Sequence, residues 1–201
     1  MEYILESNNI NDYLTHDKYI DFDNIIIQKK VLELYNFSFT ENENIKNIYN
    51  YVRDRISHSG DIDNEIVTKT ASDVLLYKEG ICIAKSFLLA AFLRLLNIPT
   101  GLCYQRLTQD ETPESGYIIH GLNAVYLSTK NKWIRLDARG NKKNIRAEFS
   151  TDIEKIAYPT RREYDEIDYP IIYAKPHKLV IEALEKYNNR KKDIWDIDSL
   201  N

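Results

Sequence analysis

A cysteine, a histidine and an aspartate stand at positions where they can form a nucleophilic site. Cys82 comes directly after Gly80 and Ile81, at the expected start of a long apolar helix. The unpaired N–H groups and the dipole at a helix start stabilise a thiolate, and one N–H can bind the oxyanion that acyl transfer creates beside the sulfur. Cys82 is therefore a candidate nucleophile. The alternative is a small apolar side chain buried in the core.

His120 and Asp137 are the candidate base and the group that orients it. A hairpin turn over residues 128–131 pairs Leu127 with Lys132. In this register Asp137 lies diagonal to His120 on one face of the hairpin, about 7 Å away. A carboxylate bonded to one imidazole nitrogen leaves the other nitrogen to take the thiol proton. Taken singly, each is better explained as an ordinary strand residue or a strand-end cap, so the prediction rests on the three residues together.

Helices in the first half of the chain and strands in the second half must position these residues. Apolar residues recur at helical spacing over 25–35 and 45–56, and Thr40 with Glu43 forms a capping-box pattern. Helices followed by antiparallel strands predict an α+β fold, with irregular chain after Arg139. The other expected elements are helices at 72–77, 82–96 and 178–190 and strands at 101–107, 117–127 and 132–137.

The composition excludes several classes of protein. The chain has 201 residues, of which 43% are hydrophobic and 29% charged, so it can form a core without metal or disulfide staples. A formal net charge of −4 leaves no broad basic surface for nucleic acid. The histidines and cysteines lack the spacing of a zinc site, and thiol chemistry needs no cofactor. We predict no metal, no cofactor and no nucleic-acid partner.

No membrane segment is expected, because the longest apolar run, 87–96, contains Arg94 and reaches only half a bilayer span. The first eleven residues carry Glu2 and Glu6 but no Lys or Arg ahead of an apolar run, which is not the pattern of a secretory signal. We therefore expect a cytoplasmic protein without membrane partners, in which Cys82 and Cys103 stay reduced.

The residues around the three candidates also resemble a known family. Gly80-Ile81-Cys82 begins an apolar helix, RLLNIP stands at 94–99, and WIRLD ends at Asp137. Further matching stretches lie at 51–59, 71–75, 103–107, 120–125 and 137–142. The pattern is similar to the transglutaminase-like superfamily, and within it to the bacterial cysteine-protease-type proteins, over about residues 19–184. The resemblance implies a papain-like core and a catalytic triad of Cys82, His120 and Asp137.

Two positions depart from the patterns of these families. Leu122 stands where many members have an aromatic residue, and Leu76 stands where papain-type enzymes have the glutamine of the oxyanion hole. Another oxyanion donor is then required. His58 and Gln105 are the candidates, and Tyr104 is a candidate for the lining of a cleft near the triad. The alternatives are a helix cap, a solvent-facing side chain and a core aromatic residue, in that order.

We predict one domain over residues 1–201, with a helical part at about 19–97, a sheet part at about 101–140 and a C-terminal extension at 141–201. In it, the Cys-bearing helix packs on an antiparallel sheet. The expected function is hydrolysis of a peptide or protein amide through a thioester on Cys82. The alternatives are acyl transfer from a glutamine side chain to an amine, and a non-catalytic module that binds peptides. The sequence identifies neither the substrate nor the oligomeric state.

Overall fold

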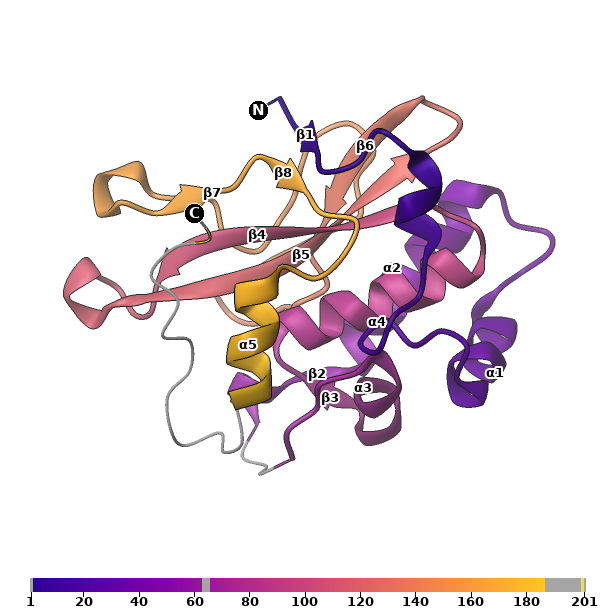
Figure 1. Cartoon of the computed structure of the whole chain (residues 1–201), viewed down its shortest axis with the longest axis horizontal. Helices are drawn as coiled ribbons and strands as arrows, with labels where there is room; N and C mark the ends of the chain where they lie inside the picture. The colour runs from indigo at the N-terminus through magenta and orange to yellow at the C-terminus, as the bar shows by residue number, and fades with distance from the viewer. Residues whose placement is uncertain (1, 63–65, 187–199, 201) are drawn as a thin grey trace.

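The structure is a computed structural model that describes residues 2–62, 66–186 and 200. Figure 1 shows the first four helices gathered on one side of the two long strands β4 and β5. This arrangement confirms the predicted α+β class. The helices and the strands of the main sheet are α1 (Ile25–Leu34), α2 (Glu41–Arg55), α3 (Ala71–Tyr77), α4 (Cys82–Leu95), β4 (Thr100–Thr108), β5 (Tyr117–Leu127), β6 (Lys132–Leu136), β7 (Ile167–Asp168) and α5 (Lys178–Lys186).

Helix α2 begins and packs as its sequence predicts. The Thr40 hydroxyl accepts the N–H of Glu43, and the Glu43 carboxylate accepts the N–H of Thr40, so the capping box is complete. Ile45, Ile48 and Val52 recur at helical spacing and are buried. The helix therefore presents one apolar face to the core, and its C-terminal end leads directly into the segment that carries His58.

Helix α4 is the centre of the core. Every residue from Ile83 to Arg94 is buried, including the charged side chains of Lys85 and Arg94. Arg94 donates hydrogen bonds to the carbonyl oxygens of Thr15, Thr100 and Ala174, and these bonds compensate for its burial. Apolar residues occur on all sides of the helix, as expected for a helix that other elements surround.

The main sheet has the strand order β6-β5-β4-β7. Within the hairpin of β5 and β6, Leu127 pairs with Lys132 and Asn123 pairs with Leu136, which confirms the predicted register. On the other side of β5, His120 pairs with Gln105 of β4. Asp137 follows the last pair of the hairpin and therefore lies close to the β5 residues that precede Asn123.

The two faces of the sheet pack against different partners. Leu102, Tyr104 and Val125 belong to the main core around α4, whereas Cys103 and Leu122 belong to a smaller cluster on the opposite face. This division follows from the period of two along a strand. His120 and Gln105 share the face of the smaller cluster, because paired residues point to the same side.

Several short elements differ from the sequence prediction. Residues before α1 include a strand and a 3-10 helix, and the chain after Arg139 contains two strands and a 3-10 helix that were expected to be irregular. Two-residue strands have no periodicity to detect. The predicted end of the last helix at Arg190 lies outside the described residues. The remaining elements are β1 (Ile4–Leu5), β2 (Ser57–His58), β3 (Glu79–Gly80), β8 (Ile171–Ile172) and the 3-10 helices Ile10–Leu14, Ser59–Asp61, Pro113–Ser115 and Arg162–Tyr164.

Candidate active site

Cys82 is the first residue of α4 and is half-buried. Ile81 before it is extended and makes no side-chain cap, so no side chain caps the first-turn N–H groups beside the sulfur. Strand β3 pairs in parallel with β2, and this pairing places His58 opposite Gly80. An added Cβ on Gly80 would lie 3.0 Å from a methyl of Val74, so glycine suits the close packing of this turn. Cys82 and His58 are thus brought together by two short strands.

His120 and Asp137 meet as the hairpin register predicts. The Nε2 atom of His120 lies 2.8 Å from Oδ2 of Asp137, and both side chains are buried. The same carboxylate accepts the N–H of Ala157 at 3.0 Å and, through Oδ1, the N–H of Arg139 at 3.0 Å. Burial would raise the pKa of Asp137, but the charge of His120 and these hydrogen bonds lower it. Asp137 is therefore ionised and fixes the orientation of the imidazole.

Cys82 and His120 lie close enough to shift each other's pKa. Because Nε2 of His120 binds Asp137, Nδ1 is the nitrogen that is left for the sulfur. Burial opposes ionisation of the thiol, but the charge and hydrogen bond of His120, together with a hydrogen bond from His58, lower the pKa of Cys82 to about 5. Burial lowers the pKa of His120, whereas the charges of Asp137 and Cys82 outweigh it and raise this pKa to about 10. At neutral pH the pair is a thiolate and an imidazolium.

His58, the last residue of β2, also interacts with the sulfur of Cys82. Its Nδ1 accepts the N–H of Gly60 at 3.1 Å, which leaves Nε2 as the atom that carries the proton. Burial lowers the pKa of His58, and its hydrogen bond to Cys82 only partly opposes this effect. His58 is therefore a neutral donor beside the sulfur. The expectation that it merely caps the preceding helix is wrong, because it caps the 3-10 helix Ser59–Asp61 that follows it.

Gln105 and Tyr104 do not join this cluster. Gln105 is fully buried on the face of His120, and its Nε2 donates to the carbonyl oxygen of Tyr158 at 3.2 Å. Its amide therefore holds the segment of Tyr158, and the alternative of a solvent-facing side chain is also wrong. Tyr104 points to the opposite face, is fully buried, and accepts the N–H of His177 at 3.3 Å. It is a core aromatic residue, because neighbouring strand residues point to opposite faces.

Two residues of the site carried no signal in the sequence. The ring of Tyr158 packs edge-on against His120, with ring centroids 5.0 Å apart. Burial raises the pKa of Tyr158 to about 12, so its hydroxyl stays protonated beside the thiolate. Ala157, next to it, supplies the N–H that binds Asp137. Both lie in a segment without helix or strand periodicity, so only the folded chain brings them to the site.

An ion-pair cluster borders the site near His58. Arg139 forms a bidentate ion pair with Asp61, and Lys142 donates to the same carboxylate at 2.9 Å. These cations lower the pKa of Asp61 to about 2, although burial acts in the opposite direction. The guanidinium of Arg139 also places a positive charge near Cys82. The cluster keeps the loop after Asp137 close to the 3-10 helix that follows His58.

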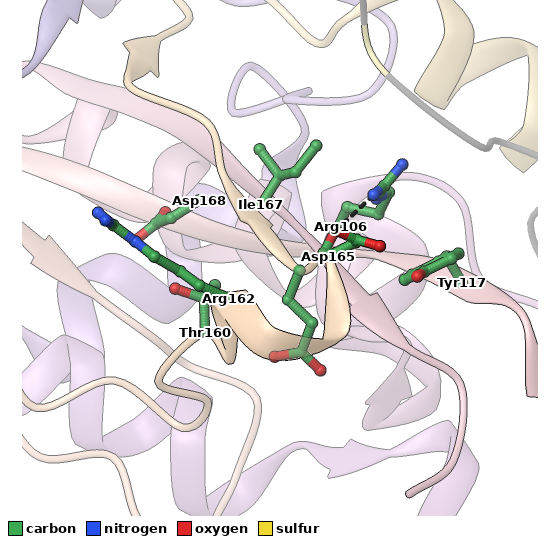
Figure 2. Close-up of a pocket in the computed structure, with 8 residues that line it drawn as sticks. Arg106, Tyr117, Thr160, Arg162, Asp165, Ile167 and Asp168 are labelled. Carbon is green, nitrogen blue, oxygen red and sulfur yellow. Dashed lines mark hydrogen bonds between the residues drawn. The ribbon is translucent and has the colours of Figure 1, made fainter. Parts of the chain in front are cut away.

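Two hollows in the surface lie near these elements. One, of about 270 Å³, is lined by residues that include His58, Asp61 and Arg139, but by none of the three candidate catalytic residues. The other, of about 590 Å³, lies around β7 and the start of β5. Figure 2 shows Arg106 beside Tyr117 in this second hollow, and Arg162 extending toward Asp168 across it. None of the three candidate catalytic residues lines it.

Among the described residues, no group of His, Cys, Asp and Glu side chains has an arrangement that could hold a metal ion. The described helices also include none with the length and apolar character needed to cross a bilayer. Cys82 and Cys103 are both free thiols. Burial raises the pKa of Cys103 to about 12, so the two sulfurs differ strongly in their tendency to ionise.

The chain belongs to the transglutaminase-like superfamily, whose family model matches residues 33–138. This range covers more than half of the chain and includes Cys82, His120 and Asp137. No curated protein matches the chain at a significant level.

Several solved structures are similar to the chain at low sequence identity. A structure from Cytophaga hutchinsonii, described as a candidate cysteine protease, has 19% identity and a TM-score of 0.52 over 66% of this chain and 43% of that chain. A transglutaminase structure has 13% identity and a TM-score of 0.44 over 95% of this chain and 52% of that chain. The periplasmic domain of TgpA from Pseudomonas aeruginosa has 11% identity and a TM-score of 0.45, over 63% of this chain and 46% of that chain. The chain thus spans about half the length of these structures.

Proposed function

We propose that the protein is a cysteine-dependent hydrolase of peptide amides, with Cys82 as nucleophile, His120 as acid and base, and Asp137 as the orienting carboxylate. The observation that carries the proposal is the buried His120–Asp137 pair beside a half-buried cysteine at a helix start. Cys82 is less buried than the two residues that activate it, and those two residues are shielded from water. A low dielectric strengthens their mutual interaction, which is the arrangement that nucleophilic catalysis requires.

The reaction divides into two steps. The Cys82 thiolate attacks the amide carbonyl carbon, and the carbonyl oxygen takes up the negative charge. The Nδ1 proton of His120 then passes to the leaving amine, the C–N bond breaks, and a thioester on Cys82 remains. In the second step His120 removes a proton from water, the hydroxide adds to the thioester, and the carboxylic acid leaves as the sulfur returns to the thiolate. Asp137 keeps Nδ1 aimed at the sulfur throughout.

His58 supplies the oxyanion donor in this proposal, in place of the glutamine that Leu76 replaces. Its Nε2–H lies beside the sulfur, and the accepted bond from Gly60 fixes this tautomer. The backbone N–H of Cys82, at the uncapped helix start, is the second donor. Both donors are in place before the charge develops, so they stabilise the transition state without further rearrangement.

The hollow lined by His58 and Arg139 is the proposed place for the part of the substrate next to the cleaved bond. It adjoins the oxyanion donor, and its volume of about 270 Å³ is comparable with one or two side chains. The cytoplasmic location and the single domain expected from the sequence remain predictions.

The test of the function is a peptide-cleavage profile. The protein is incubated with a complex mixture of peptides, with and without a fluorescent primary amine, and new termini and labelled glutamines are identified by mass spectrometry. We expect cleavage by the wild type and by Cys103→Ser, and none by Cys82→Ala. Amine incorporation at glutamine without cleavage would establish acyl transfer instead. Retention of peptides without any chemistry would establish a binding module.

His58→Ala tests the oxyanion role. We expect kcat for a cleaved peptide to fall about 100-fold with little change in KM. Alkylation of Cys82 by iodoacetamide forms no oxyanion, so its rate should fall far less than kcat. His177→Ala, which removes a histidine packed on Tyr173 away from the cluster, is the matched control. An equal loss in both rates would mean that His58 serves only to ionise the thiol.

A further inference from the structure

Lys85 is a buried lysine that the proposed reaction does not use. It lies three residues after Cys82 on α4, and its side chain is fully buried. Its Nζ donates to three backbone carbonyl oxygens: Ile56 at 2.6 Å, Arg139 at 2.9 Å and Arg53 at 3.4 Å. A buried cation is tolerated only where its donors are satisfied, and here each of the three N–H groups has an acceptor.

The three carbonyls belong to the segments that carry the other site residues. Arg53 and Ile56 lie at the C-terminal end of α2, where unpaired carbonyls and the helix dipole favour a cation. Ile56 is two residues before His58. Arg139 is two residues after Asp137, and its own N–H binds the Asp137 carboxylate. One ammonium group therefore joins the helix of Cys82 to the strand of His58 and to the loop of Asp137.

We propose that Lys85 is a positioning residue for the active site, which sets the placement of His58 and Asp137 relative to Cys82. This inference rests on the proposed function of the triad. Lys85 touches neither the reacting atoms nor the substrate; it acts through the two backbone segments that it binds. The equivalent contacts of Arg94, at the other end of the same helix, go to Thr15, Thr100 and Ala174, none of which carries a site residue.

The loop of Asp137 is built around this ammonium group. Gly140 has a φ of +107°, and an added Cβ would lie 3.2 Å from the Arg53 carbonyl oxygen and 3.5 Å from Nζ of Lys85. Glycine is therefore needed for the loop to approach both groups. Burial and the charge of Arg139 lower the pKa of Lys85 to about 7, whereas the carboxylates of Asp137, Asp54 and Asp61 oppose this shift. A neutral amine would have two N–H groups for three carbonyls, so the protonated form fits the site.

The experiment compares Lys85→Met with Arg94→Met. Both variants remove a buried cation from α4 and leave carbonyls unpaired, so both should lower the thermal midpoint. The second readout is the pH dependence of Cys82 alkylation by iodoacetamide, measured on folded protein by mass spectrometry. We expect Lys85→Met to move the midpoint of this profile up by about one pH unit, because a displaced Asp137 and His58 stabilise the thiolate less well. Arg94→Met should leave the midpoint where it is in the wild type.

Gly140→Ala provides a second variant if Lys85→Met does not fold. It displaces the same loop without removing the ammonium, and we expect an upward shift of the same midpoint in the same direction. Unchanged midpoints in the folded Lys85→Met and Gly140→Ala proteins would overturn the positioning role, and so would an equal shift in Arg94→Met. An ordinary thiol profile already in the wild type would instead contradict the proposed function itself, which keeps the two failures distinguishable.

Discussion

Three side chains carry the proposed chemistry: Cys82 begins α4, and the hairpin of β5 and β6 brings His120 and Asp137 together. The helix start at Cys82 and the hairpin register of His120 and Asp137 follow from apolar patterns and a turn, both of which are local signals. The role of His58 is different. Its position depends on the pairing of β2 with β3. Each of these strands has two residues, which is too short for a periodic sequence pattern to predict it. From the sequence, His58 is therefore only one of two candidate oxyanion donors, with Gln105 as the other.

Asp137→Asn tests the orienting carboxylate. The variant keeps the size of the side chain but removes the charge that raises the pKa of His120. His120 then holds its proton less tightly, the Cys82 thiolate loses part of its partner's charge, and we expect kcat/KM for a cleaved peptide to fall by about 100-fold or more. Steady-state kinetics at pH 7 measures the effect.

Glu166→Gln is the matched control for this variant. Glu166 is also a buried carboxylate in an ion pair, with Arg161, but it lies away from the triad. Its substitution should leave kcat/KM within about twofold of the wild type. Equal losses in the two variants would mean that burial of a carboxylate, and not its bond to His120, is what matters.

At the scale of elements, the contact between α4 and β5 sets the distance between nucleophile and base. Gly121 follows His120 and faces the helix, where an added Cβ would lie 2.7 Å from Cγ1 and 2.9 Å from Cα of Ile83. A side chain at this position would push apart the two elements that carry Cys82 and His120. The packing of β5 against α4 therefore requires glycine at position 121, directly after His120.

Gly121→Ala should weaken both the fold and the site. Overpacking against Ile83 is expected to lower the free energy of unfolding by about 1–3 kcal/mol, as measured by urea denaturation. It should also raise the apparent pKa of Cys82, because His120 is displaced from the sulfur. Gly116→Ala is the control: Gly116 has a φ of +84° but no atom within 4 Å of an added Cβ, so that variant strains the backbone and leaves the thiol pKa unchanged. A normal Cys82 profile in Gly121→Ala would refute this account of the contact.

The long elements were predictable and the short ones were not. The capping box of α2, the apolar run of α4 and the strands β5 and β6 were all predicted within one or two residues, because each repeats its pattern over several turns or pairs. The segment that holds Ala157 and Tyr158 has no such repeat. It is ordered by single contacts, such as those to Asp137 and Gln105, which depend on the folded partners.

At the scale of the molecule, the segment after the sheet completes the site. Arg135 is buried on β6 and makes bidentate contacts to Glu154, before Ala157 in the chain, and to Asp168 of β7. Arg53 at the end of α2 binds the carbonyl oxygen of Ala147 at 2.9 Å. Two arginines thus tie this segment to the sheet and to the helices, and it carries Tyr158 to His120.

Arg135→Met should loosen this segment. Removing one partner of a buried ion-pair network costs about 3 kcal/mol, because Glu154 and Asp168 lose their shared cation. We expect a corresponding loss in the free energy of unfolding, measured by urea denaturation, and a lower kcat for peptide cleavage. Lys155→Met, which breaks an exposed ion pair with Glu148 in the same segment, should leave the free energy of unfolding close to the wild-type value. Arg135 does not order this segment if both variants lose the same free energy of unfolding and kcat of Arg135→Met stays at the wild-type value.

The pH dependence of Cys82 alkylation tests the central claim most directly. A thiol with its pKa lowered to about 5 ionises above that pH, so the rate should rise with a midpoint near pH 5 and reach a plateau by about pH 7. At pH 6 Cys82 should react at least about 100-fold faster than the buried Cys103, whose pKa is raised to about 12. His120→Ala should move the Cys82 midpoint toward the ordinary thiol value. A wild-type midpoint near 8.5 that His120→Ala does not change would contradict the existence of the catalytic pair.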